Sequence, residues 1–186
     1  MREEIEEFRD GIFALRTRRF GTVAELMIRK LFGLQGSKSL SYDLLGNDKG
    51  AELKVEVKFS TVMKQNDATI RAENLIEQCK KANLANRAMR FDELGKYPFD
   101  CNIQQVKCSE FDLLYYGLFF ADLILIFSMR NDEVAHCPNS SDKQHRGNRG
   151  EGQFHLNGDS IGYHLERHKL TAITYEELYD LFANNA

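Results

Sequence analysis

The chain has 186 residues, with 25 Lys and Arg against 28 Asp and Glu, four Cys, two Pro and no Trp. Its composition, 42% hydrophobic and 28% charged, is typical of a soluble globular protein and excludes both disorder and a coiled coil. The formal net charge of −3 provides no overall attraction for nucleic acid. Any affinity for DNA must therefore be local or supplied by a partner.

A chain of this length buries about 70% of its unfolded surface, so it needs neither disulfides nor a structural metal to fold. We expect one domain over residues 1–186, without a separate DNA-recognition domain. The four cysteines form no CxxC pair, and the first residues lack the apolar stretch of a secretory signal. These features predict a reducing, cytoplasmic location.

Residues 113–129 form an apolar run that resembles a membrane span at first sight. The run has 17 residues and contains Asp122, whereas a spanning helix needs about 20 apolar residues. Its enrichment in Phe, Tyr, Leu and Ile favours two buried strands joined by a short turn. We therefore expect no membrane insertion.

Apolar residues at helical spacing predict one helix over residues 3–16 and a second that follows Gly21 and ends at Gly33. The pattern then changes to that of strands. Two strands are predicted at residues 40–45 and 52–59, joined by a turn at residues 46–50.

The rest of the chain alternates between the two patterns. It predicts a helix over 67–89, strands over 111–119 and 122–129, a loop or hairpin over 131–158, a strand over 163–173 and a helix over 175–182 with Thr174 as its N-cap. This order predicts an α/β or α+β fold with a central mixed β-sheet flanked by α-helices.

Charged side chains alternate with apolar ones along residues 52–59. One face of this predicted strand carries Glu52, Lys54, Glu56 and Lys58. Asp43 lies on the strand before it. Carboxylates on adjacent strands, together with a backbone carbonyl, can hold Mg²⁺ and its bound waters. A lysine two residues beyond the glutamate projects from the same face, where it can orient a water and stabilise a pentavalent phosphorus.

These residues therefore supply the groups that phosphodiester hydrolysis needs. The alternative is a solvated strand face, on which the same charges form cross-strand ion pairs worth about 0.2–1 kcal/mol each.

With Asp43, Glu56 and Lys58 the sequence resembles the PD-(D/E)XK nuclease superfamily, which includes many restriction endonucleases and Holliday-junction resolvases. Residues 21–25, GTVAE, lie on the predicted helix that ends at Gly33 and are similar to the N-terminal helix of that superfamily, whose Glu often contributes to the metal site. The resemblance covers about the first 90 residues. It departs from the motif at Tyr42, where the superfamily has proline.

The resemblance implies a restriction-endonuclease-like core that depends on Mg²⁺, with Mn²⁺ as a substitute. It implies that Asp43 and Glu56 ligate the metal together with the backbone carbonyl of Val57. It also implies that Lys58 holds the attacking water and that Glu25 supports the site through a water.

A second ExK motif, Glu52-Leu53-Lys54, lies on the same face of the same strand. Hairpin geometry alone does not choose between the two registers. We prefer Glu56 and Lys58, because of their separation from Asp43 and because the Phe59-Ser60 that follows is similar to the Lys-aromatic-Ser run of some family members. Asp48, in the predicted turn, is a weaker substitute for Asp43.

Other polar groups suggest contacts with phosphates. Arg16, Arg18 and Arg19 precede the second predicted helix, and Gln78 lies on the helix after the strand of the candidate site. Residues 145–150 predict a basic loop that meets a phosphate backbone or another subunit. The alternative for the three arginines is a solvated basic cluster, and the alternative for Gln78 is a residue that caps the edge of the core.

A zinc site is the remaining alternative for the last third of the chain. Its candidate ligands are His136, Cys137, Cys101 and Cys108. Because none of them has the close spacing of a structural zinc site, we do not favour it.

Neither a helix-turn-helix nor a zinc finger is evident outside the nuclease motif. The chain is in this respect similar to the small subunits of heterodimeric type IIS restriction endonucleases. That resemblance implies a large partner subunit that recognises double-stranded DNA and nicks one strand, while the small subunit cuts the other nearby. The alternatives are a self-sufficient homodimeric restriction enzyme, a Holliday-junction resolvase and an inactive interaction module.

Overall fold

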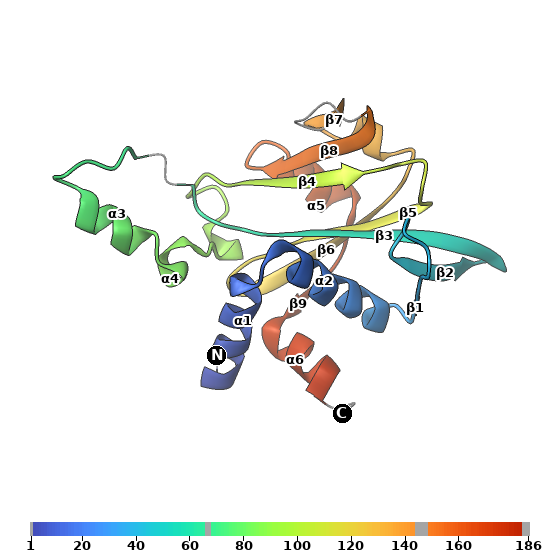
Figure 1. Ribbon diagram of the computed structural model, residues 1–186, viewed down its shortest axis with the longest axis horizontal. Coiled ribbons are helices and arrows are strands. Elements are labelled where there is room, and N and C mark those ends of the chain that lie inside the picture. The colour runs from blue at the N-terminus through green and yellow to red at the C-terminus, as the bar shows by residue number, and fades with distance from the viewer. Residues whose placement is uncertain (1, 66–67, 144–148, 184–186) are drawn as a thin grey trace.

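The computed structural model describes residues 2–65, 68–143 and 149–183, and two β-sheets organise them (Figure 1). The larger sheet has the order β1-β2-β3-β5-β6-β9, and the smaller has the order β4-β8-β7. In the larger sheet β3 runs parallel to β5 and the other pairs are antiparallel. The strands are β1 Gln35–Gly36, β2 Leu44–Asp48, β3 Ala51–Thr61, β4 Asp100–Val106, β5 Leu113–Phe119, β6 Leu123–Arg130, β7 Ser140–Lys143, β8 Arg149–Asn157 and β9 Lys169–Thr174.

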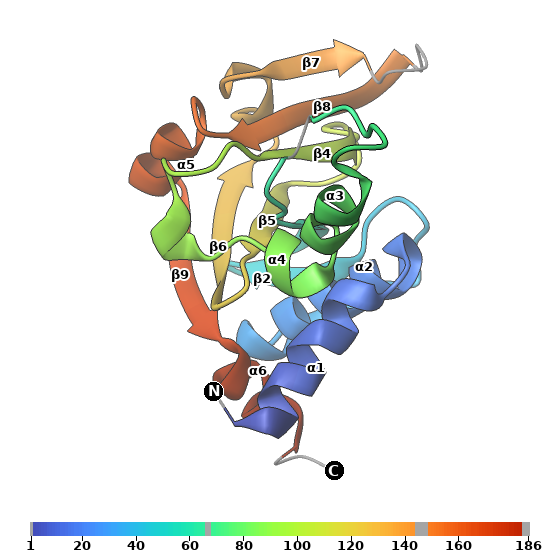
Figure 2. The ribbon, with the colours of Figure 1, turned by 90° about the vertical axis from the view of Figure 1, so that its left-hand side faces the viewer.

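The first two helices and the last one cover one face of the larger sheet, and the smaller sheet covers the other together with the fifth helix (Figures 1 and 2). The helices are α1 Glu3–Ala14, α2 Thr17–Leu31, α3 Leu75–Lys81, α4 Leu84–Arg87, α5 Ile161–Arg167 and α6 Tyr175–Ala183. Side chains of β5 alternate between two cores, since Tyr115 and Phe119 pack with α1, α2 and α6, whereas Leu114 and Tyr116 pack with β4, β8 and α5. The predicted central mixed sheet flanked by helices is confirmed.

The apolar run at residues 113–129 forms β5 and β6, which pair antiparallel. Every residue of β5 except the first is buried, so the prediction of two buried strands is confirmed. Within the described ranges, the structure has no helix that is long and apolar enough to cross a membrane.

Three predicted helices are confirmed. Helix α1 lies in the first predicted range. Helix α2 begins at Thr17, so Gly21 lies within it and not before it as predicted, and Gly33 ends α2 in the left-handed conformation with φ of 65°. The third, α6, begins with a capping box, because Thr174 Oγ1 accepts the N–H of Glu177 while the Glu177 carboxylate accepts the N–H of Thr174.

The strand predicted at residues 40–45 lies four residues later, as β2. The segment predicted as a turn continues the strand through Asp48, and the actual turn consists of Lys49 and Gly50, both with positive φ. Asn47 closes this turn by accepting the N–H of Gly50 at 2.8 Å. Two residues with positive φ match the twist of a tight hairpin, which explains why the shorter turn is preferred.

The long helix predicted over 67–89 is wrong as one element. Only α3 and α4 form, because Asn83 starts a new helix by accepting the N–H of Ala85 at 3.0 Å. Met89 then leaves the helix and is buried in the core beneath the smaller sheet.

The strand predicted over 163–173 is also wrong in its first half, where α5 forms and β9 follows. Ile161, His164 and His168 are buried at helical spacing, and the two polar histidines hid this pattern in the sequence. Strand β4 was not predicted at all. The segment predicted as a loop or hairpin over 131–158 contains the β7–β8 hairpin.

Candidate active site

The candidate site lies where β2 begins and leaves the edge of β3 open. Leu44 is paired with Val55, and β2 covers β3 only as far as that residue. Asp43 precedes the pair, and its carboxylate Oδ2 accepts the backbone N–H of Val57 at 2.9 Å. The side chain of Asp43 thus replaces the backbone partner that β3 lacks beyond the end of β2.

Glu56 and Lys58 flank Val57 and project from one face of β3. Glu56 is only 8% exposed, and the Nζ of Lys58 donates a hydrogen bond to its Oε1. This ion pair is partly shielded from water, unlike a pair on a solvated strand face. The Glu56–Lys58 pair, at the end of the stretch in which charged and apolar residues alternate, is therefore partly buried and not fully solvated.

Val57 presents backbone groups to the open edge of β3. In a strand, the N–H and the C=O of one residue point to the same neighbour. Because the N–H of Val57 is directed at Asp43, its carbonyl oxygen faces the same open edge. Its side chain is buried in the core with α2, which holds this stretch of β3 in place.

Glu25 approaches the site from α2. It is half-buried, and burial raises the pKa of its carboxyl; repulsion from Asp43 raises this pKa further, whereas Lys58 lowers it. Asp43 and Lys58 act electrostatically on both Glu25 and Glu56, although the four side chains come from α2, the start of β2 and the middle of β3.

The carboxylates outnumber the cation. Burial raises the pKa of Glu56, the Lys58 ammonium lowers it, and repulsion from Asp43 and Glu110 raises it. Three carboxylates against one ammonium leave negative charge in a partly desolvated place. A divalent cation bound here would relieve the repulsion among these carboxylates.

The donor set suits a hard cation. Mg²⁺ prefers oxygen ligands and keeps several of its waters, so it is held by one or two carboxylates rather than by a full protein cage. Among the residues the structure describes, no three Asp, Glu, His or Cys side chains already enclose a metal position. Asp43 and Glu56 would accordingly bind the ion with the carbonyl of Val57 and water.

The second ExK register is placed differently. Glu52 pairs with Asn47 near the hairpin tip, and the side chains of Glu52 and Lys54 are exposed. The Nζ of Lys54 lies 5.9 Å from the centre of the Tyr42 ring. Asp48 forms an ion pair with Arg130 at 2.8 Å, at the far end of β2 from Asp43. The structure brings Asp43 together with Glu56 and Lys58 and leaves the second register at the exposed tip.

The other predicted contacts are scattered. Exposed side chains at the start of α2 include Arg16, Arg18 and Arg19. Gln78 is buried in α3 and lines a pocket of about 420 Å³ beyond the end of β3, with Lys64 and Arg87. Most of the predicted basic loop at 145–150 lies outside the described residues.

The candidate zinc ligands do not come together as a site. Within the described part of the chain, no three His, Cys, Asp or Glu side chains form a group that could hold a metal ion. Burial raises the pKa of both Cys101 and Cys137 to about 12. Cys137 donates to the carbonyl of Val134 at 3.1 Å.

Two acidic residues near the site were missed in the sequence. Glu110 acts on the pKa of Glu56, and Asp112 Oδ2 accepts the N–H of Lys54 at 2.8 Å. Both precede β5, the parallel neighbour of β3. The sequence carried no local signal for them, because the parallel pairing of β3 with β5 joins residues that are far apart in the chain.

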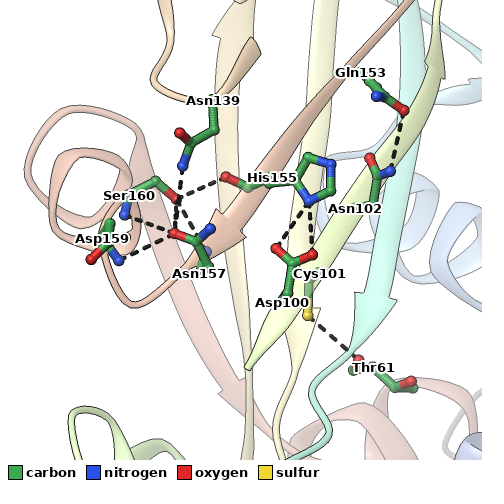
Figure 3. Close-up of polar contacts among 10 residues, drawn as sticks. All are labelled: Thr61, Asp100, Cys101, Asn102, Asn139, Gln153, His155, Asn157, Asp159 and Ser160. Atoms are coloured by element: carbon green, nitrogen blue, oxygen red, sulfur yellow. Dashed lines mark hydrogen bonds and ion pairs between the residues drawn. The ribbon is translucent and has the colours of Figure 1, made fainter. Parts of the chain in front are cut away.

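A second polar cluster lies on the smaller sheet (Figure 3). His155 Nδ1 lies 2.9 Å from both carboxylate oxygens of Asp100 across β4 and β8. Ser160 is fully buried, and its hydroxyl donates to the backbone carbonyl of His155 at 2.7 Å rather than to the imidazole. These three residues therefore do not form a nucleophilic triad, and the cluster serves to pair the strands.

No protein-family model and no curated protein matches the chain. Among solved structures, the chain is similar to a bacterial homing endonuclease, with a TM-score of 0.37 and 16% sequence identity over 76% of this chain and 78% of that chain. A likeness of this degree does not define an activity, so function rests on the geometry of the site.

Proposed function

We propose that the chain is a Mg²⁺-dependent DNA endonuclease subunit of the PD-(D/E)XK type. The observation that supports this most is the hydrogen bond from the N–H of Val57 to Asp43, because it holds the first carboxylate beside the Glu56–Lys58 pair. Asp43, Glu56 and Lys58 also have the residue types and the order along the chain of the PD-(D/E)XK motif.

The reaction is hydrolysis of a phosphodiester. A water oxygen bonds to phosphorus and the bond from phosphorus to the 3′ oxygen breaks, leaving a 5′-phosphate and a 3′-hydroxyl. A bound Mg²⁺ would supply charge neutralisation and a more acidic water. The ammonium of Lys58 orients the water and stabilises charge on the phosphoryl oxygens. Asp43 and Glu56 hold the cation, and Glu25 supports it through a water.

One such site cuts one strand. We propose that a large partner subunit recognises the DNA and nicks the other strand, as in type IIS restriction. The net charge of −3 agrees with recognition supplied from outside this chain.

The second candidate is an inactive interaction module with the same fold. The pairing of Lys58 with Glu56 favours it, since part of the carboxylate charge is already neutralised within the protein. The two candidates differ in metal binding and in cleavage.

The test is cleavage of a supercoiled plasmid in Mg²⁺ by the purified chain, alone and mixed with a candidate large subunit encoded beside it. Double-strand cuts in the mixture that are lost with Glu56→Ala would support the endonuclease subunit. Specific cuts by the chain alone would indicate a self-sufficient homodimer. A chain that cuts in no mixture and binds no Mn²⁺ would be the inactive module.

A further inference from the structure

Helix α2 carries a stripe of residues that continues beyond Glu25. Successive residues of an α-helix turn by about 100°, so positions four later and seven earlier lie on the same side of the helix as Glu25. These positions are Arg29 and Arg18, and both are exposed. The side of α2 that presents Glu25 to the candidate site is therefore lined by an arginine in each direction.

Arg29 is not committed to the neighbouring acid. Glu25 and Arg29 have the spacing that favours an ion pair on a helix. No such pair forms among the described residues, and Arg29 is not among the charges that act on the pKa of Glu25. Its guanidinium instead extends over Gly36, where Nη1 lies 3.7 Å from the position that a Cβ would occupy.

Strand β1, which carries Gly36, pairs with β2, which begins one residue after Asp43. Gly36 pairs with Leu44, and the next residue, Ser37, donates its N–H to the carbonyl of Asp43 at 3.1 Å. Arg29 is thus an exposed cation one strand away from the first carboxylate of the site.

The spacing along α2 suits a phosphate backbone. With a rise of 1.5 Å per residue, Arg29 lies about 6 Å beyond Glu25 along the helix axis, and Arg18 lies about 10 Å before it. One strand of B-DNA advances about 3.4 Å along its axis per phosphate. The two arginines therefore bracket the site by roughly two to three nucleotides on either side.

We propose that this stripe of α2 binds the backbone of the strand being cut, with Arg29 and Arg18 each holding a phosphate roughly two to three nucleotides from the scissile one. The inference rests on the proposed endonuclease function and names how the DNA strand is positioned. Arginine suits this role, because its planar guanidinium donates two parallel hydrogen bonds to a phosphate. Both arginines act as positioning residues, since they hold phosphates other than the one that reacts.

The experiment measures binding of a fluorescent DNA duplex by anisotropy over a range of salt concentrations, in a Glu56→Gln background that does not cut. Arg29→Ala should weaken binding roughly tenfold and lower the slope of log K against log salt by about 1. Arg29→Lys keeps the charge and should retain most of the slope. Arg167→Ala is the matched control, because Arg167 is an exposed arginine on α5 and should bind as the parent does.

Cleavage kinetics in the active background give a second readout. Because Arg29 contacts a phosphate in both ground and transition states, Arg29→Ala should raise KM with little change in kcat. Arg29→Gln removes the charge but keeps most of the length of the side chain. It should raise KM in the same way, and it replaces Arg29→Ala if the alanine variant is unstable.

The outcomes separate this inference from the proposed function. If the wild type binds and cuts DNA while Arg29→Ala and Arg29→Gln match Arg167→Ala in affinity, salt slope and KM, the phosphate stripe is wrong and the endonuclease stands. If the wild type neither binds nor cuts DNA with any partner, the proposed function fails and the stripe fails with it.

Discussion

The carboxylate of Asp43 accepts the backbone N–H of Val57 at 2.9 Å, across the gap left where β2 stops covering β3. This single bond fixes which part of β3 faces the acid. Glu56 and Lys58 lie on either side of Val57, so they share its position relative to Asp43, whereas Glu52 and Lys54 lie toward the hairpin tip.

The register gives the first prediction. Glu56→Ala should reduce cleavage more than 100-fold, because it removes a buried carboxylate from the site. Glu52→Ala, on the same strand and face, should cut within about twofold of wild type, since Glu52 is exposed beside Asn47. Plasmid cleavage rates of the two variants, each mixed with the candidate large subunit, decide which of the two ExK motifs is catalytic. The opposite ranking would assign the site to the second ExK motif.

The second prediction concerns the charge of Lys58. Lys58→Ala should lower kcat about 10²–10³-fold, because the ammonium that stabilises phosphoryl charge is lost. Lys58→Arg should recover only part of the rate, since a guanidinium is wider and cannot act as the same point charge. Single-turnover cleavage measures both variants. Unchanged cleavage by Lys58→Ala would remove Lys58 from the mechanism.

The carboxylates predict a dependence of metal binding on pH. The pKa values of Glu25 and Glu56 are both raised, so these groups lose their protons at higher pH than ordinary glutamates. Because a metal binds the ionised form, Mn²⁺ affinity should increase as pH rises through the range above 4.5. Isothermal titration over a pH series tests this.

Asp43→Asn is the matched variant for that series. It removes one source of repulsion, so the pKa of Glu56 and that of Glu25 should both fall. NMR titration of the carboxyl carbons measures both pKa values. Total Mn²⁺ affinity should nevertheless decrease, because a ligand is lost. If neither pKa moved, the three acids would not form one electrostatic unit.

His164 predicts acid sensitivity away from the site. It is fully buried, its Nδ1 lies 2.7 Å from the Tyr116 hydroxyl, and burial lowers its pKa to about 4. Between pH 4 and 6.5 the unfolded chain binds a proton there that the folded chain does not, so stability should fall as pH drops through this range, by up to about 3 kcal/mol.

Denaturant unfolding at pH 7 and pH 4 measures this loss. His164→Gln should show a smaller difference in free energy of unfolding between the two pH values than the wild type does. His136→Gln, at an exposed position, should keep the wild-type difference. Equal pH dependence in all three proteins would contradict the assignment.

Gly117 predicts a packing limit next to β3. A Cβ at this position would lie 2.1 Å from the carbonyl oxygen of Leu125 and 2.3 Å from Cε1 of Phe59. Gly117→Ala should therefore destabilise the fold by at least about 1–3 kcal/mol, seen as a lower Tm. Gly162→Ala is the control, because nothing lies within 4 Å of its Cβ position. A wild-type Tm for Gly117→Ala would refute the close contact.

Local patterns were sufficient for the elements in which a single pattern extends along the whole segment. Helices α1, α2 and α6 were predicted from the helical spacing of their apolar residues, strand β3 from its alternating charged and apolar residues, and strands β5 and β6 from a continuous apolar run that is buried almost throughout. Strand β4 was missed because Gln105 adopts φ of 58° and shifts the register between Ile103 and Val106, which breaks the period of two.

The sequence by itself determined the residue types of the candidate site and the mixed α+β class, since both depend on composition and spacing along the chain. Only the tertiary structure decided that Glu25 and Glu56 both lie within the electrostatic reach of Asp43 and Lys58, that Glu52 and Lys54 are exposed toward the hairpin tip, and that Glu110 acts on Glu56. The reason is that these contacts depend on strand pairing, namely on the hairpin register, on the residue at which β2 ends and on the parallel pairing of β3 with β5. Such pairings join residues far apart in the chain, and no local periodicity encodes them.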